Sequence, residues 1–295
     1  RMKIQYVDHS FRKASLDVID QANAIIEEYQ AQGYSLTLRQ LYYQMVARDM
    51  IENSQRSYKR LGSKINNARL SGLIDWFAIE DRTRNLRGQP HWSSPASIIE
   101  AAVSSYQIDK WKYQPFYVEV WIEKDALVSV AKRICDRLDV PYFSCRGYTS
   151  SSEMWGAGRR ILRKRRDGKA PFILHLGDHD PSGIDMTRDI GERLEMFSEG
   201  PVDVSRIALN MEQIHRHNPP PNPAKVTDSR SDGYIALYGD ESWELDALPP
   251  QVLTGLIREN VRSFRDEDEW EKAVARENEE KQALREAADG LHTSP

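Results

Sequence analysis

The feature that most constrains this chain is an apolar stretch that runs directly into a turn with two carboxylates. Residues 172–176 read FILHL, typical of a buried strand, and residues 177–183 read GDHDPSG, which ends the strand and starts a helix near Ile184. In parallel sheets, ligands bind at the carboxyl ends of the strands. Asp178 and Asp180 can both face that edge and offer Mg²⁺ the hard oxygen ligands that it prefers. The alternative is an Asx turn with a helix N-cap, which requires one aspartate but not two.

The central part of the chain repeats this order of strand and helix. Strands are predicted over 116–122, 141–145 and 172–177, with a further one near 206–209, and helices over 125–138, 150–166, 182–197 and 251–264. The alternation predicts an α/β domain with a parallel sheet and right-handed crossovers. Glu123 comes just after the first strand, so it is expected at the same edge as Asp178 and Asp180. The three acids together predict a site for Mg²⁺ or Mn²⁺.

The N-terminal part predicts a helical DNA-binding domain. Amphipathic helices are expected over 10–32, 37–48 and 54–70, and the tight break before the third is typical of a helix-turn-helix. Residues 73–79 predict a strand, and arginines after it would decorate a wing. Basic side chains on the third helix and the wing are the expected DNA contacts: Arg56, Lys59, Arg60, Lys64, Arg82 and Arg84. The alternative for the third helix is an ordinary solvated face.

Composition limits the class of protein and favours separate domains. The first 95 residues carry 14 Lys or Arg against 10 Asp or Glu, and the remainder carries 27 against 35, so only the N-terminal part is basic. Residues 88–97 form a polar linker with two prolines, which places a boundary near residue 95; residues 266–295 predict a charged peripheral helix. No apolar run approaches twenty residues and no signal peptide is recognised, so a cytoplasmic, nucleoid-associated protein is expected, with no membrane partner.

A helical wheel separates the two adjacent tyrosines of the second helix. With Leu38 at the centre of the apolar face, Tyr42 falls on that face, whereas Tyr43 falls on the same flank as Arg39. Tyr43 is therefore expected to project away from the core, beside a guanidinium that could hold a phosphate. A tyrosine hydroxyl has an unperturbed pKa of about 10, so it needs a positive neighbour or a general base to act as a nucleophile. The alternative is a simple surface aromatic.

The predicted helix over 150–166 carries a run of basic residues, among them Arg163 and Lys164. Such a run is compatible with a solvated helix end. If it lay beside the carboxylates, it could instead hold a phosphate backbone.

Two motifs resemble the topoisomerase VI A subunits and the related meiotic break-forming transesterases. These are a strand ending in Glu123, followed 55 residues later by DHDPSG (178–183), and RQLYY over 39–43. The resemblance covers roughly residues 35–260, and segments 57–61, 79–84 and 243–248 are similar to small stand-alone A-like proteins of bacteria and phages. It implies a winged-helix domain over 1–95 and a Toprim domain, a Rossmann-like parallel sheet that binds metal, over 96–265. It also implies a homodimer in which Tyr43 attacks double-stranded DNA and forms a 5′-phosphotyrosyl break.

The chain departs from the family pattern in two places. After the second strand it has CRGYTS (145–150) instead of a GKGxPD turn, which leaves Arg146 as the candidate phosphate contact. It contains no ATPase domain, so strand passage would need a separate ATPase subunit. Two alternatives remain: a hydrolytic Toprim nuclease within a defence or chromosome-maintenance complex, and a non-catalytic winged-helix DNA-binding protein.

Overall fold

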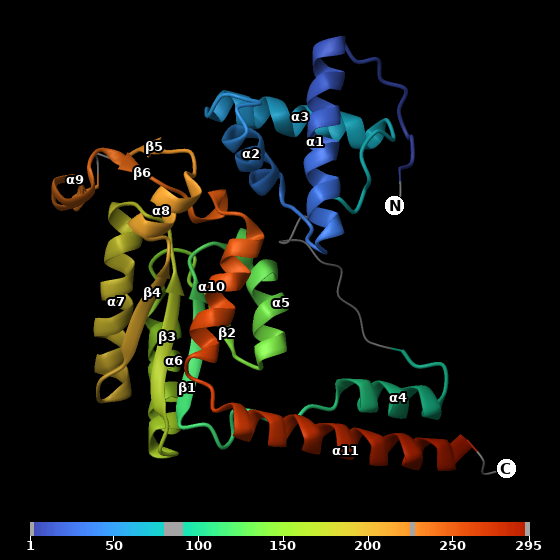
Figure 1. Ribbon diagram of the computed structural model, residues 1–295, viewed down its shortest axis with the longest axis vertical. Helices are drawn as coiled ribbons and strands as arrows, with labels where there is room; N and C mark the ends of the chain where they lie inside the picture. Colours follow the sequence, from blue (N-terminus) through green and yellow to red (C-terminus); the bar gives the residue numbers. More distant parts are fainter. Residues whose placement is uncertain (1–2, 80–90, 225–227, 293–295) are drawn as a thin grey trace.

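A four-stranded parallel sheet forms the centre of the computed structural model, which describes residues 3–79, 91–224 and 228–292. Its strands are β1 (Phe116–Ile122), β2 (Tyr142–Ser144), β3 (Ala170–Leu176) and β4 (Asp203–Ala208), in the order β2-β1-β3-β4 (Figure 1). The predicted α/β class is confirmed. The chain passes from β1 to β2 on one side and then crosses back to β3 on the other. The strand order therefore reverses between β1 and β3, the place where α/β sheets bind ligands.

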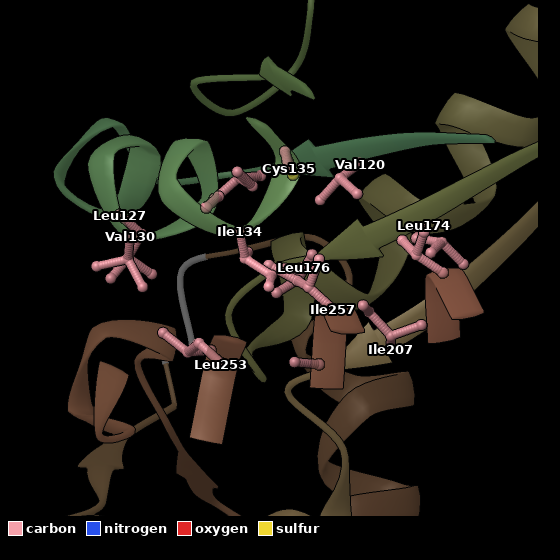
Figure 2. Close-up of a cluster of buried hydrophobic side chains, with 14 of the residues drawn as sticks. Val120, Leu127, Val130, Ile134, Cys135, Leu174, Leu176, Ile207, Leu253 and Ile257 are labelled. Atoms are coloured by element: carbon pink, nitrogen blue, oxygen red, sulfur yellow. The ribbon is translucent and has the colours of Figure 1, made fainter. Parts of the chain in front are cut away.

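Helices cover both faces of the sheet because alternate strand residues are apolar on both sides. Val118, Val120 and Ile122 of β1 pack with α5 (Val128–Leu138) and α10 (Pro250–Arg262). Tyr117 and Trp121 face the other way and pack with α6 (Ser151–Arg166) and α7 (Pro181–Ser198). Strand residues with period two thus supply two cores. Figure 2 shows the first core, with Leu174, Leu176 and Ile207 from the sheet beside Ile134 and Ile257 from the helices.

The N-terminal part folds into three helices with a core of their own, as the sequence predicts. They are α1 (Lys13–Ala31), α2 (Leu38–Ala47) and α3 (Gln55–Leu70). Thr37 begins α2 with a capping box that it shares with Gln40, and Ser54 caps α3 through the amide of Ser57. The apolar faces of the three helices meet in one buried cluster. This cluster also includes Ala247, which belongs to the domain built around the parallel sheet, called the sheet domain below.

Residues 73–79 do not form the predicted strand. The side chain of Asp75 accepts a hydrogen bond from the amide of Phe77 at 2.8 Å, and its carbonyl accepts one from the amide of Ala78 at 3.1 Å. This local turn competes with extended pairing, and the segment makes only an isolated bridge between Ile79 and Leu36. A periodicity of apolar residues does not detect such a turn. The predicted wing contacts Arg82 and Arg84 lie outside the described residues.

A pair of helices far apart in the sequence lies beside the sheet domain. α4 (Pro95–Ser105) packs along α11 (Glu267–His292), which confirms the predicted C-terminal helix (Figure 1). Glu277 of α11 ion-pairs with Lys110 and accepts the amide of Ile108 at 3.1 Å. The shorter elements are η1 (Asp125–Leu127), α8 (Met211–His217), β5 (Asn222–Pro223), α9 (Ser231–Tyr238), β6 (Glu241–Ser242) and η2 (Leu245–Ala247). Within the described part of the chain, no helix combines the length and apolar character needed to cross a bilayer.

Candidate active site

The three predicted acids meet at the carboxyl edge of the sheet. Glu123 directly follows β1, and Asp178 and Asp180 follow the neighbouring strand β3. The Oε2 atom of Glu123 accepts a hydrogen bond from the amide of Asp178 at 2.8 Å. The strand order reverses between these two strands, so the acids border the crevice where α/β sheets bind ligands. The predicted convergence of Glu123 with Asp178 is therefore confirmed.

The two aspartates have different structural roles. Asp180 is the N-cap of α7 and accepts hydrogen bonds from the amide of Gly183 at 2.6 Å and the hydroxyl of Ser182 at 2.9 Å. Asp178 is not the N-cap residue of any helix in the described part of the chain. Its Oδ1 accepts the amide of Leu245 at 2.8 Å, and its Oδ2 lies 2.7 Å from the Nζ atom of Lys124. The alternative of a helix N-cap thus accounts for Asp180 but not for Asp178.

The chain around the acids is packed so closely that Gly183 has no room for a Cβ atom and Gly177 has little. A Cβ atom at Gly183 would lie 2.2 Å from the carbonyl oxygen of Asp178, and one at Gly177 would lie 2.9 Å from Oε2 of Glu123. Arg206 of β4 holds the same turn, because its guanidinium donates to the carbonyls of Gly177 and Gly183, each at 2.9 Å, and to that of Asp178. Burial lowers the pKa of Arg206, against the attraction of the nearby acids.

A segment remote in sequence completes the site. Residue 243 pairs with the acidic turn, since the amides of His179 and Trp243 donate to each other's carbonyls at 2.8 and 2.9 Å. This pairing brings Glu244 and Asp246 to the carboxylate edge. Glu244 contacts Lys124, and Asp246 has a fully buried side chain. The sequence patterns predict no site role for these residues, although segment 243–248 is one of those that are similar to the stand-alone A-like proteins.

Burial and the repulsion between neighbouring acids disfavour the ionised forms of Glu123 and Asp178. Burial raises the pKa of Asp178 to about 8 against the attraction of Lys124, and Glu123 acts in the same direction as burial. Burial also raises the pKa of Glu123. For Lys124 burial favours the neutral form, but the attraction of Asp178, Asp246 and Glu244 outweighs it and raises the pKa of the ammonium. The acids therefore require a positive partner to remain ionised.

Arg39 connects the N-terminal helices to this edge. Its Nη2 donates to Oε2 of Glu244 at 3.0 Å, and its Nε lies 3.0 Å from Oδ2 of Asp246. Glu244 thus contacts both Arg39 and Lys124, and Lys124 in turn contacts Asp178. A continuous series of ion pairs runs from α2 to the acids. Arg39, the predicted phosphate contact, thus pairs with two carboxylates of the protein itself in this structure.

Tyr43 lies in the protein interior, which corrects the prediction that it projects away from the core. Its side chain is 5% exposed, close to the value of 4% for Tyr42. The helical wheel places Tyr43 on a flank of α2 that would face solvent, but η2 of the sheet domain covers this flank. The guanidinium of Arg39 lies 5.8 Å from the centre of the Tyr43 ring. Burial, with Glu244 and Asp246 nearby, raises the pKa of the Tyr43 hydroxyl to about 12 although Arg39 opposes the shift.

The donor set fits a hard divalent cation. Glu123, Asp178 and Asp180 supply only carboxylate oxygens, the ligands that Mg²⁺ and Mn²⁺ take in proteins. In residues 3–79, 91–224 and 228–292 no three His, Cys, Asp or Glu side chains form a ready metal cage. Both oxygens of Asp178 already have partners, one of them the ammonium of Lys124. A divalent cation at Asp178 would therefore lie close to the Lys124 ammonium and be repelled by it.

The predicted DNA contacts on α3 share one outward face. Arg56, Lys59 and Arg60 are exposed, Lys64 is half-buried, and depressions in the surface lie between them. Among the residues that the structure describes, none of the four forms an ion pair with a carboxylate. Leu61, Ile65 and Ala68 point the other way into the core. This face is available for phosphate groups.

The remaining predicted contacts lie at opposite edges of the sheet. Arg146 follows β2 at the carboxyl edge, is largely exposed and ion-pairs with Asp125. Arg163 and Lys164 lie near the end of α6, which runs back to the amino edge, where Lys169 donates to the carbonyl of Gln114 at 2.8 Å. These two residues are not beside the carboxylates, contrary to the hypothesis that the basic run adjoins the acids. The direction of a crossover helix explains the difference.

Comparisons with known proteins reveal no relative of this chain. No family model matches it, and neither a curated protein nor a solved structure does. The resemblance to topoisomerase VI A subunits remains a prediction that rests on the sequence motifs.

Proposed function

We propose that this chain cleaves double-stranded DNA at the carboxylate edge with Mg²⁺ or Mn²⁺ held by Glu123, Asp178 and Asp180. The observation that supports the proposal most directly is the series of ion pairs that joins these acids to Arg39 on α2. It links a candidate metal site to the helix that carries Tyr43. The three-helix N-terminal part is proposed to be a winged-helix-type domain that binds DNA through α3.

In this proposal Tyr43 is the nucleophile. A bond forms between its hydroxyl oxygen and phosphorus while the bond to the 3′ oxygen breaks; the tyrosine proton passes to solvent and the 3′ oxygen gains one. A bound divalent cation would supply charge neutralisation at the scissile phosphate. Arg39 would bind that phosphate after leaving Glu244 and Asp246. Paired cuts require a homodimer. If each Tyr43 acts at the partner's acids, as the resemblance implies, the ion pairs between α2 and the acids of its own chain must open first. Strand passage requires a separate ATPase subunit.

The burial of Tyr43 favours a second candidate, a hydrolytic nuclease in which water attacks. Tyr43 is 5% exposed and the pKa of its hydroxyl is raised to about 12, so the side chain must leave its contacts and lose its proton before it can react. Water at the carboxylate edge requires no such movement. This candidate retains the same metal ligands and the same DNA-binding face.

Supercoiled plasmid incubated with the protein and Mg²⁺ or Mn²⁺ tests the proposal. The reaction is stopped with detergent and divided into samples with and without protease digestion. Linear DNA that enters the gel normally only after protease carries covalently bound protein, as transesterification by Tyr43 requires. Linear DNA that migrates identically in both samples indicates hydrolysis. Intact plasmid under all metal conditions, with DNA binding retained, would contradict both candidates.

The exposed face of α3 gives a separate prediction for DNA binding. Replacing all four basic residues with glutamine is expected to weaken duplex binding about 10²-fold or more at physiological salt, because each lost phosphate contact removes counterion release. The slope of log affinity against log salt should become shallower by about 3.6, roughly 0.9 for each lost phosphate contact. Fluorescence anisotropy with a labelled duplex at several salt concentrations measures both. The variant contains R56Q, K59Q, R60Q and K64Q.

A matched control for this prediction is available on α6. The double variant R163Q and K164Q removes basic residues from the opposite edge of the sheet and should leave affinity within about threefold of wild type. Equal losses of log affinity per removed charge in the two variants, four charges against two, would show that the effect is one of net charge, and the assignment of α3 as the DNA-binding face would be rejected.

A further inference from the structure

Lys124 occupies the position at which a cation would bind Asp178. Its Nζ lies 2.7 Å from Oδ2 of Asp178, and its side chain is only 18% exposed. The other oxygen of Asp178 accepts the amide of Leu245. An ammonium and a divalent cation would therefore compete for the same carboxylate oxygen.

The same ammonium already has a second set of acceptors on its other side. Lys124 contacts Oε2 of Glu244, an atom that also accepts from Arg39. Asp246 lies close enough to raise the pKa of Lys124. Lys124 thus lies between Asp178 on one side and Glu244 and Asp246 on the other.

Asp246 is the acid that the fold leaves least satisfied. Its side chain is fully buried, and no other residue that the structure describes donates a hydrogen bond to its oxygens. The Nε atom of Arg39 lies 3.0 Å from Oδ2 of Asp246 and forms an ion pair with it, but the geometry does not allow a hydrogen bond. A buried carboxylate without hydrogen bonds is costly, and a cation that moved toward it would relieve that cost.

We infer that Lys124 is a built-in counter-ion of the carboxylate site, which a divalent cation displaces from Asp178 toward Glu244 and Asp246. The inference rests on the proposed metal site but not on DNA cleavage or its nucleophile. It has a structural consequence, because Lys124 then competes with Arg39 for the same two acids. Cation binding at Asp178 would weaken the contact that holds α2 and free Arg39 for a phosphate.

Binding of Mn²⁺ to the purified full chain, measured without DNA by the electron paramagnetic resonance signal of free Mn²⁺, tests the inference. Lys124→Met removes the competing ammonium and should raise Mn²⁺ affinity about tenfold. Asp246→Asn removes an acceptor for the displaced lysine and should lower Mn²⁺ affinity severalfold, although Asp246 itself is not a proposed ligand. Lys124→Arg keeps the charge and should show no gain.

Lys132→Met is the matched control, because Lys132 is an exposed lysine that forms an ion pair with Asp136 on its own helix at 2.6 Å. Circular dichroism checks that each variant is folded. If wild type binds Mn²⁺ and Lys124→Met binds it no more tightly, or if Asp246→Asn leaves affinity unchanged, the counter-ion role is rejected while the proposed cleavage stands. If Lys124→Met gains affinity but no DNA is cut, the counter-ion role holds and the proposed function fails. Absence of Mn²⁺ binding in every folded variant overturns both.

Discussion

Replacing Glu123 with glutamine is expected to reduce metal-dependent plasmid cleavage by at least about 10³-fold, which corresponds to about 4 kcal/mol of lost transition-state stabilisation. The amide oxygen of glutamine can still accept the hydrogen bond from Asp178, so the edge of the sheet should keep its geometry. The lost element is the negative charge that would hold a divalent cation. Initial rates of linearisation at saturating Mg²⁺ and Mn²⁺ measure the effect.

Glu123 is a better position for this test than Asp178. An asparagine at 178 would remove one of the two acids that Lys124 contacts, and breaking a buried ion pair commonly costs about 3–5 kcal/mol of stability. A loss of cleavage could then reflect unfolding.

The control for Glu123→Gln is Glu153→Gln, an exposed acid in the first turn of α6. Both variants should bind duplex DNA with the wild-type dependence on salt, because α3 is unchanged. Cleavage by Glu123→Gln within about threefold of wild type would reject the metal assignment.

The sheet and its acids were predictable because their signals are local. The bounds predicted for the first strand, 116–122, agree with β1, since a strand buried on both faces reads as a continuous apolar run. The order of strands and helices then requires parallel pairing, which brings Glu123 and Asp178 to one edge. No knowledge of tertiary contacts was needed for either step.

Residues that reach the site through distant pairing could not be predicted in the same way. Asp246 follows Asp178 by 68 positions and approaches it only because residue 243 pairs with the turn at His179. The burial of Tyr43 has the same origin, because η2 covers a flank that a helical wheel regards as solvent. Amphipathic patterns describe one element at a time, and contacts between domains follow from the fold as a whole.

Tyr43→Phe is expected to eliminate protein covalently linked to DNA ends while leaving DNA affinity unchanged. The substitution removes one oxygen and retains the ring, which packs edge to face against Tyr42 with centroids 5.2 Å apart and lies beside Arg39. The fold should therefore be preserved, with only the hydroxyl and its interaction with Arg39 lost. Labelled DNA treated with the protein and metal, denatured and resolved by gel electrophoresis, reports the covalent species directly.

Tyr42→Phe separates this chemical effect from a structural one. The Tyr42 hydroxyl donates to Asn53 at 2.9 Å and accepts from the amide of Ser54 at 2.8 Å, so its removal should cost about 1 kcal/mol of stability without reducing the covalent product of the folded protein. If Tyr43→Phe cuts DNA at the wild-type rate and neither protein leaves linked ends, water is the nucleophile. Tyr43 would then be a buried contact between α2 and η2, and the series of ion pairs through Arg39 would serve to hold the two domains together rather than to activate a hydroxyl.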